Sequence, residues 1–404
     1  MTHSPSAPVT AYNWQTPPHN RWAFWNVREI LPVQRIHRAP AASVLESADT
    51  LPGLSTITLS DVDGQLTTVA AVLGATDTDA FAVSREGAVL SEWYRPGGSA
   101  DRPHAVMSIT KSMVGWVAGA LRERGELDAD RLITAYVPEL SASGYAGARV
   151  RDVADMRSGI QFNEEYVNPD SEIRKLGDWL GWYPDSPAEN APGLYRFVAN
   201  LTADSPHGGP FVYRSCESDV LGWVCERAGG RPMAELLSEH LWSVIGAEHD
   251  ADLLCDRLGT ALHNGGASVT ARDLLRFGSA LLPSPQAPSW LRAAWAVDAD
   301  HRAAFAASTA EAAMPGGWYR DQFWFRPGPQ GDVLLGLGIY GQLLYVNRRS
   351  RTVCAKFSSW PVPQDPVRLQ NTLRACDAVS VVLECSAATG TSAARPVRSP
   401  RSLF

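Results

Sequence analysis

The segment Ser108-Ile109-Thr110-Lys111 places a hydroxyl and an amine at a spacing that suits nucleophilic catalysis. Residues three positions apart lie on one face of an α-helix, so the two side chains can reach each other. A desolvated lysine can lose its proton and act as a base, whereas arginine stays charged. A base beside a serine can activate the hydroxyl for acylation. The competing interpretation is an exposed helical turn with a capping serine, because so short a motif also arises by chance.

The surroundings of Lys111 favour the catalytic interpretation. The chain has only three lysines, Lys111, Lys175 and Lys356, and every other strongly basic side chain is arginine. We expect such a chain to keep lysine where arginine cannot do the same work. Residues 112–121 are apolar almost all round, which predicts a buried helix. A charged ammonium there is costly unless it is paired or neutral, so Lys111 is predicted to be functional.

Tyr213-Arg214-Ser215 is a second cluster, directly before an apolar helix predicted at 217–228. A tyrosine beside a charged lysine becomes more acidic and can shuttle a proton. An ordinary half-buried tyrosine is the alternative. Tyr166-Val167-Asn168 offers a rival tyrosine motif, but no apolar helix follows it. We therefore assign proton transfer to Tyr213 and substrate binding to Tyr166.

A third cluster, Gly336-Leu337-Gly338-Ile339-Tyr340-Gly341, lies in a strand predicted at 332–340. Glycines weaken a strand and often mark a place where a ligand approaches the backbone. A bulge or a closely packed strand would use them too, so this cluster gains its meaning only from the other two.

The order of predicted elements indicates how these clusters come together. Strands are predicted near both ends of the chain, and most helices lie between them; the strands are 80–84, 88–94, 332–340, 342–347 and 352–358, and the helices are 150–156, 217–228, 231–243, 271–282 and 365–383. This order predicts an α/β (α+β) fold, an antiparallel sheet flanked by helices plus a helical lobe. Residues 13–107 and 265–385 would form a discontinuous α/β lobe, and 108–264 the helical lobe with the site in the cleft between them. Residues 1–12 and 386–404 are predicted to be disordered.

Composition and charge argue against several classes of function. With 404 residues and 45% hydrophobic content the chain can bury a large core. Its net charge of −7 is spread out without a long basic run, which argues against nucleic acid or anionic membrane as partners. No apolar stretch is long enough for a bilayer, and residues 1–8 lack the features of a secretory signal, so we expect a cytoplasmic protein.

The sequence also argues against other kinds of site. No Gly-x-Ser-x-Gly motif occurs, so an α/β-hydrolase triad has no anchor. The cluster His249-Asp250-Ala251-Asp252 lacks a second histidine, so we expect a solvated loop there and neither a metal site nor a cofactor. The cysteines show no regular spacing and are expected to be free thiols: Cys216, Cys225, Cys255, Cys354, Cys376 and Cys385.

Taken in order, the three clusters resemble the serine β-lactamase and penicillin-recognising hydrolase superfamily. Its members carry Ser-x-x-Lys on a central helix, Tyr-x-Asn or Tyr-x-Ser in the helical lobe, and a Lys-Thr-Gly-like triplet on a strand. Class C enzymes, D-aminopeptidases and carboxylesterases are the most similar branch, and residues 151–160 also resemble the segment after the serine helix there. The resemblance implies a β-lactamase/transpeptidase-like fold.

A more specific resemblance is to the 6-aminohexanoate-dimer hydrolases, the nylon-oligomer hydrolases. It runs from about Trp14 to Leu383 and is carried by residues 18–24, 163–167, 264–266, 270–274 and 358–361. It implies hydrolysis of a small linear amide or ester through an acyl-enzyme, and a homodimer is compatible with it. A D-amino-acid peptidase or esterase of the same superfamily is the alternative, and a catalytically silent, ligand-sensing protein of the penicillin-binding fold is an alternative of another class.

The resemblance also implies roles for individual residues. Ser108 would be the nucleophile, Lys111 the base that takes its proton, and Tyr213 the acid/base toward the leaving group. The backbone N–H groups of Ser108 and Ile339 would form the oxyanion hole. A serine at a helix N-terminus suits this role, because backbone donors and the helix dipole favour negative charge there. The resemblance places these residues at the substrate: Tyr166, Asn264, Trp324, Ser215 and Gly338.

Two positions depart from the family pattern. Position 336 is glycine where β-lactamases usually keep a lysine, so the carboxylate of a β-lactam would lose a cationic partner. Gly177 stands where some nylon-oligomer hydrolases carry an aspartate for the substrate's ammonium, with Asp178 adjacent. The first departure argues against β-lactams as substrates. The second favours an esterase, which needs no such acid.

Overall fold

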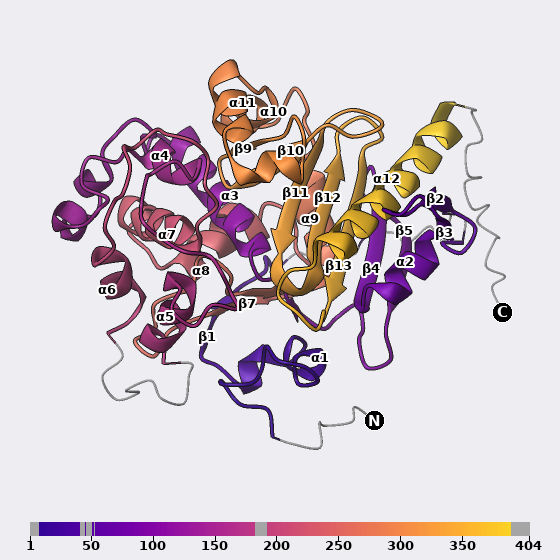
Figure 1. Cartoon of the computed structure of the whole chain (residues 1–404), viewed down its shortest axis with the longest axis horizontal. Helices are drawn as coiled ribbons and strands as arrows, with labels where there is room; N and C mark the ends of the chain where they lie inside the picture. The colour runs from indigo at the N-terminus through magenta and orange to yellow at the C-terminus, as the bar shows by residue number, and fades with distance from the viewer. Residues whose placement is uncertain (1–7, 41–44, 46–50, 52, 182–191, 389–404) are drawn as a thin grey trace, which may run out of the picture.

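A seven-stranded antiparallel sheet forms the centre of the computed structural model, which describes residues 8–40, 45, 51, 53–181 and 192–388 (Figure 1). Its strand order is β5-β4-β13-β12-β11-β10-β9. The strands are β4 (Thr78–Arg85), β5 (Ala88–Tyr94), β9 (Trp318–Arg320), β10 (Phe323–Arg326), β11 (Val333–Gly338), β12 (Gln342–Asn347) and β13 (Thr352–Ser358). β13 pairs with β4, so strands from the N-terminal and C-terminal parts of the chain lie side by side within one sheet.

Alternation along each strand divides the sheet into two packed faces. In β4, Ala80 and Ala82 join the cluster that packs against helices α3 (Ile109–Glu123) and α9 (Ala271–Ala280). Phe81 and Val83 join the cluster that packs against α2 (Val69–Ala75) and α12 (Pro366–Ala388). Successive strand side chains point to opposite faces, so a strand covered on both sides is apolar throughout. The predicted class, an antiparallel sheet flanked by helices, is confirmed.

The helices lie on both faces of this sheet and in a region beside it (Figure 1). They are α1 (Asn20–Ala23), α2 (Val69–Ala75), α3 (Ile109–Glu123), α4 (Val150–Ala154), α5 (Glu172–Trp179), α6 (Leu194–Ala199), α7 (Ser215–Gly229), α8 (Met233–Leu237), α9 (Ala271–Ala280), α10 (Ser289–Trp295), α11 (Ala299–Ala306) and α12 (Pro366–Ala388). Within the described ranges, no helix is both long and apolar enough to cross a membrane.

A second, smaller sheet has the order β1-β7-β8-β6. Its strands are β1 (Val33–Ile36), β6 (His104–Ala105), β7 (Ala251–Leu254) and β8 (Ala267–Val269), and β2 (Thr58–Ser60) pairs separately with β3 (Leu66–Thr68). Sequence analysis did not find this second sheet, because its strands are short and come from distant parts of the chain. β6 ends three residues before Ser108, so this sheet helps to position the start of α3.

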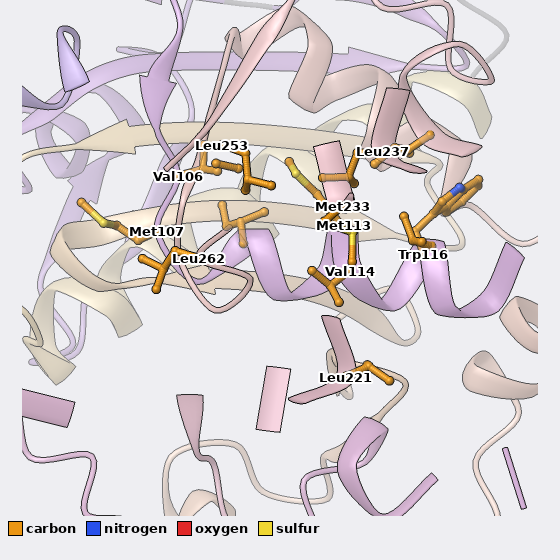
Figure 2. Packing of buried hydrophobic residues seen from close by; sticks show 14 of the residues in the cluster. Val106, Met107, Met113, Val114, Trp116, Leu221, Met233, Leu237, Leu253 and Leu262 are labelled. Atoms are coloured by element: carbon orange, nitrogen blue, oxygen red, sulfur yellow. The ribbon is translucent and has the colours of Figure 1, made fainter. Parts of the chain in front are cut away.

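Helix α3 is the buried helix that the sequence predicted. Met113, Val114 and Trp116 of α3 lie among side chains of the neighbouring elements, including Leu221 of α7 and Leu237 of α8 (Figure 2). Gly115 allows α3 to approach the turn between β9 and β10 closely, because a Cβ at this position would lie 2.3 Å from the carbonyl oxygen of Asp321. The helix is therefore fixed on several sides, and its N-terminal end is held in place.

Some predicted boundaries were wrong. The strand predicted to end at Tyr340 ends at Gly338, because Tyr340 adopts a left-handed conformation (φ 62°) that no strand accommodates. The helix predicted at 231–243 is α8 followed by a wider π-helical turn at Ser238–Trp242. Of the two ends predicted to be disordered, residues 1–7 and 389–404 lie outside the described residues. Residues 8–12 belong to a turned segment, and 386–388 belong to α12.

Two other sequence-based expectations concern the cluster at 249–252 and the cysteines. The cluster 249–252 is no solvated loop, because Asp252 lies in β7 and its buried carboxylate pairs with Arg28 at 2.7 Å and Arg35 at 2.9 Å. All six cysteines are free, as predicted, and only Cys385 is exposed. Asp298, Asp300 and His301 form another acidic group at the start of α11, where the His301 ring nitrogens lie 2.7 Å from an Asp298 carboxylate oxygen and 3.1 Å from an Asp155 carboxylate oxygen, both of which are acceptors.

Candidate active site

Ser108 and Lys111 meet at the N-terminal end of α3. Ser108 precedes the first helical residue, and the Lys111 Nζ donates to its Oγ at 2.8 Å. The same ammonium nitrogen donates to the backbone carbonyl oxygen of Asn264 at 2.6 Å. Lys111 is 1% exposed, whereas Ser108 is 9% exposed and lines a cavity. The hydroxyl is therefore accessible to a small molecule while its basic partner is shielded from water.

Burial and nearby charge act in opposite directions on the amine. Burial lowers the pKa of Lys111 from its ordinary 10.5, the charges of Glu164 and Asp219 oppose this shift, and the net result is a pKa of about 8. The desolvation of the charged form is the larger effect, because the amine is fully enclosed. A substantial fraction of Lys111 is thus neutral near pH 8 and able to accept a proton.

Tyr213 lies beside the same pair. Its ring centroid is 5.1 Å from the Lys111 Nζ, and its ring stacks on Trp324 with centroids 5.2 Å apart. Burial raises the pKa of Tyr213 above its ordinary value, and the charge of Glu164 raises it further. The sequence-based expectation of a more acidic phenol is therefore wrong, because the expectation ignored burial. Tyr213 is a protonated phenol at neutral pH, which suits a proton donor better than a base.

Two carboxylates complete the polar environment, the half-buried Glu164 and the buried Asp219, and sequence analysis missed both as functional candidates. Glu164 accepts hydrogen bonds from the Tyr166 hydroxyl at 2.6 Å, the Ser215 hydroxyl at 2.5 Å and the Ser215 backbone N–H at 2.9 Å. Glu164 therefore joins the loop that carries Tyr166 to the start of α7. Its sequence signals were its place two residues before Tyr166 and its membership of the 163–167 segment that carries the family resemblance.

Asp219 is the second of these carboxylates. It lies one turn after Ser215 in α7 and accepts from the Asn264 side chain at 2.6 Å and the Asn264 backbone N–H at 3.0 Å. Burial raises the pKa of Asp219 to about 7, and the hydrogen bonds from Asn264 and the charge of Lys111 oppose that rise. Since Asn264 also presents its carbonyl oxygen to Lys111, Asp219 orients the residue that holds the amine.

Two strained backbone positions flank the expected oxyanion hole. Met107, just before Ser108, has φ 48°, and Tyr340, just after Ile339, has φ 62°. Such left-handed conformations cost about 1–3 kcal/mol each for residues other than glycine and are found where function requires them. Gly338 allows the two segments to approach closely, because a Cβ there would lie 2.6 Å from the Val106 carbonyl oxygen.

Two adjoining cavities meet at Ser108. The larger has a volume of about 510 Å³ and the smaller about 90 Å³. Ser108, Tyr166, Ile339 and Pro363 line both of them. Of the remaining predicted site residues, Asn264 and Ser215 line the smaller cavity, Tyr213, Trp324 and Gly338 line the larger, and Lys111 lines neither but contacts Ser108. All the residues named from the sequence thus converge on one place.

The two departures from the family pattern have distinct positions. Gly177 lines the smaller cavity, whereas Asp178 is not among the described residues that line it. Position 336 faces α3, since a Cβ there would lie 3.2 Å from the Ile109 side chain. Neither position, as the chain stands, supplies a charged group at the junction of the cavities.

The junction of the two cavities thus brings together a candidate nucleophile (Ser108), a buried amine base (Lys111) and a protonated phenol (Tyr213). The backbone N–H groups of Ser108 and Ile339 are candidate donors beside them. This set can form and break an acyl–oxygen bond on serine without histidine or metal. The hydroxyl lies between the amine and the phenol, so both proton acceptor and proton donor are within reach of the reacting bond.

Comparison with known proteins agrees with this geometry. The family model described as beta-lactamase matches residues 67–378. The 6-aminohexanoate-dimer hydrolase of Paenarthrobacter ureafaciens is 38% identical over 361 residues, which are 88% of this chain and 89% of that protein. At this identity and coverage the relationship extends well beyond the residues of the site.

Solved structures share the fold. One from Bacillus anthracis, provisionally described as a 6-aminohexanoate-dimer hydrolase, has a TM-score of 0.83 at 24% identity and covers 94% of this chain and 99% of its own. A family VIII carboxylesterase has a TM-score of 0.55 at 16% identity, with 77% of this chain and 96% of the other covered. Identities this low show the fold alone, but the family model and the curated relative span most of the sequence. The chain therefore belongs to the beta-lactamase family of serine hydrolases, with the 6-aminohexanoate-dimer hydrolase among its relatives.

Proposed function

We propose that the protein hydrolyses small linear esters and amides through an acyl-enzyme formed on Ser108. The observation that carries this proposal is the 2.8 Å hydrogen bond between Ser108 and Lys111, whose burial favours the neutral amine. The name of the curated relative supports amide hydrolysis in the family, and the loss of an acid at Gly177 favours esters here.

In the first half-reaction, the Ser108 Oγ bonds to the carbonyl carbon while its proton passes to the Lys111 Nζ. The carbonyl oxygen becomes an oxyanion, and the backbone N–H groups of Ser108 and Ile339 donate to it. The bond between the carbonyl carbon and the leaving oxygen or nitrogen then breaks. The leaving atom takes a proton from the Tyr213 hydroxyl, and the proton held by Lys111 restores the phenol.

In the second half-reaction, water takes the place of the leaving group. It bonds to the acyl carbon as its proton passes to the Tyr213–Lys111 pair, and the bond between that carbon and Ser108 Oγ breaks. The serine oxygen recovers its proton and the free acid departs. Each group ends in its starting state, so no cofactor or outside reagent enters the cycle.

A fluorophosphonate probe tests the proposal. It should add its mass to the peptide that contains Ser108, and Ser108→Ala should abolish both labelling and ester turnover. Loss of a nucleophile lowers the rate by several orders of magnitude, so Ser108→Ala should be easily distinguished from the unmodified protein. Ser112→Ala is the matched control, and it should keep both labelling and turnover. Ser112 lies in the same helix, but its hydroxyl is buried and donates to the Gln322 carbonyl oxygen. Labelling of any serine other than Ser108 would contradict the assignment, and an unlabelled, inactive protein would favour a silent sensor.

A further inference from the structure

The two cavities beside Ser108 have different roles if the proposed function holds. Tyr213 lines the larger cavity and is not among the described residues that line the smaller. The group that protonates the leaving atom must be within hydrogen-bonding distance of it. The leaving group therefore lies in the larger cavity, and the acyl group extends on the other side of the reacting carbon into the smaller one. Trp324, which stacks on Tyr213, contacts the leaving group in this arrangement.

The larger cavity suits a bulky apolar group. Its volume of about 510 Å³ is several times that of the smaller cavity. Aromatic and aliphatic side chains from separate parts of the chain contribute to its walls: Phe211, Met314, Trp324, Leu337, Leu343 and Leu369. Burying an apolar surface against such walls is favourable by roughly 25 cal/mol per Å².

The charge of this cavity is the more selective feature. Among the described residues that line it, none is lysine, arginine or histidine, and Asp365 is the only carboxylate. The nearest cation along the chain, Arg368, is already held by two carboxylates, Asp365 at 3.2 Å and Asp77 at 2.6 Å. An anion in this cavity would meet no cationic partner and would lie near an existing negative charge.

The N-terminal end of α12 does not change this conclusion. Helix N-termini attract anions, and α12 begins at Pro366 beside the cavity. However, Asp365 already accepts from the Arg368 backbone N–H at 3.0 Å, and its carboxylate offsets the positive end of the helix dipole. The free backbone donors that would hold a carboxylate are thus partly occupied by the chain itself.

We propose that the preferred leaving group is a bulky, uncharged alcohol or amine, and that a leaving group with a free carboxylate is strongly disfavoured. This inference rests on the proposed function and adds a substrate class to it. It distinguishes this chain from the substrate in its relative's name, because the 6-aminohexanoate released by hydrolysis of a 6-aminohexanoate dimer carries a carboxylate. An ester whose alcohol is aromatic or a neutral alkyl chain can fill the larger cavity without bringing a carboxylate into it.

A matched pair of substrates isolates the charge. The butanoyl ester of 6-hydroxyhexanoic acid leaves with a carboxylate, and the butanoyl ester of methyl 6-hydroxyhexanoate leaves with the same chain in neutral form. We expect kcat/KM to be at least about tenfold higher for the neutral ester, because a desolvated carboxylate without a cationic partner is costly. Added salt should lower the ratio of neutral-ester to carboxylate-ester kcat/KM only weakly, because charges in a partly buried site are little screened. Equal rates for the two esters would overturn the inference.

Two substitutions test the cavity itself. Gln364→Arg adds a cation to its wall and should raise the ratio of carboxylate to neutral ester turnover, whereas Gln364→Met should not. Ala310→Phe reduces the volume and should lower turnover of a 2-naphthyl butanoate more than that of methyl butanoate. Ala303→Phe is the matched control, because Ala303 is exposed on α11 outside the cavity and the same side chain is added there.

The outcomes separate the inference from the proposed function. If Ser108 is labelled and esters are hydrolysed, but Ala310→Phe and Ala303→Phe behave alike, the leaving group does not use the larger cavity. If Ser108 is not labelled and no ester is hydrolysed, the proposed function is wrong and this inference is wrong with it. A faster carboxylate ester in the unmodified protein would also contradict it directly.

Discussion

Lys111 shows how burial changes the chemistry of a residue. In water its amine would be almost entirely protonated at neutral pH, whereas the fully enclosed side chain has a pKa of about 8. Glu164 and Asp219 prevent a still lower value, because their charges favour the ammonium. The same amine can therefore lose a proton to start the reaction and hold the proton it takes from Ser108.

Substituting the base tests this account. We expect Lys111→Arg to be nearly as inactive as Lys111→Ala, because arginine keeps the charge and cannot deprotonate. Steady-state ester hydrolysis measures the effect, and circular dichroism with a thermal melt checks that the variant folds. Substantial turnover by the arginine variant would show that the amine acts only as a positive charge.

The pH dependence follows from the same residue. Activity requires neutral Lys111, so kcat/KM for a neutral ester should rise with pH and level off above about 8. Two pH units below that value, only about 1% of the amine is neutral, and kcat/KM should be about a hundredfold lower. A profile that falls between pH 6 and 8 would contradict the role of the base.

Glu164→Gln tests in which direction the pH profile of kcat/KM moves. The Glu164 carboxylate raises the pKa of Lys111, so its removal should lower that pKa and move the profile toward lower pH. The variant should also turn over more slowly, because Glu164 holds Tyr166 and Ser215. A slower enzyme with an unmoved profile would show that Glu164 only positions these residues.

At the scale of elements, the site depends on the close approach of β11 to the start of α3. Gly338 ends β11 where the backbone of Val106 is too near for any side chain. Tyr340 then turns left-handed, and its backbone N–H donates to the Pro363 carbonyl oxygen at 2.8 Å. Gln342 also holds this turn, since it donates to the carbonyl oxygens of Tyr340 and Ser358 at 3.4 and 2.6 Å.

Adding one methyl group to β11 tests this dependence. Gly338→Ala would bring a Cβ to 2.6 Å from the Val106 carbonyl oxygen and must move Ile339 away from Ser108. A displacement of about 1 Å can cost a hundredfold in rate, so kcat should fall by about ten- to a hundredfold. Gly336→Ala on the same strand is the control, because its nearest contact is the Ile109 side chain at 3.2 Å and needs only a small adjustment. Equal losses in the two variants would argue that the strand merely tolerates no alanine.

At the scale of the whole molecule, the two ends of the chain build one sheet. β4 and β5 precede α3, and β9 to β13 follow the helical region, yet β4 pairs with β13. The division into an α/β lobe (13–107 and 265–385) and a helical lobe (108–264) remains a prediction, and this sheet is the observation that supports it. The site lies where α3, β11, α7 and the segment after β13 come together, so its substrates depend on all of them.

The relative rates at which different classes of substrate are hydrolysed depend on the whole cleft. We expect clear hydrolysis of short-chain p-nitrophenyl esters, weaker cleavage of 6-aminohexanoate dimer, and little turnover of nitrocefin. β-Lactams carry a carboxylate, and β11 offers Gly336, Leu337 and Gly338, none of which is charged. Losing a charge-assisted hydrogen bond costs about 1.5–3 kcal/mol, roughly ten- to a hundredfold in rate. Initial rates with one enzyme preparation test the order, and nitrocefin turnover faster than ester turnover would reverse it.

The sequence by itself determined which residues were candidates for the chemistry and where most of the elements lie. The spacing of Ser108 and Lys111 predicted their contact, because three residues are almost one turn of a helix. The apolar run after Lys111 predicted burial, and the alternation of the late segments predicted strands. The rarity of lysine was a weaker guide. Lys356 is also buried, with its Nζ 3.3 Å from the Thr76 carbonyl oxygen, and Lys175 forms an exposed pair with Glu172 at 3.2 Å.

Only the tertiary structure decided how the groups act on one another. Glu164 and Asp219 are two acids among many in the sequence, and nothing local distinguishes a carboxylate that will lie beside a buried amine. The direction of the Tyr213 pKa was wrong for the same reason, since desolvation depends on what packs around the ring. The two cavities are likewise made by segments distant in sequence. Spacing along the chain predicts contacts within one element, whereas burial, charge and cavity shape arise from contacts between elements.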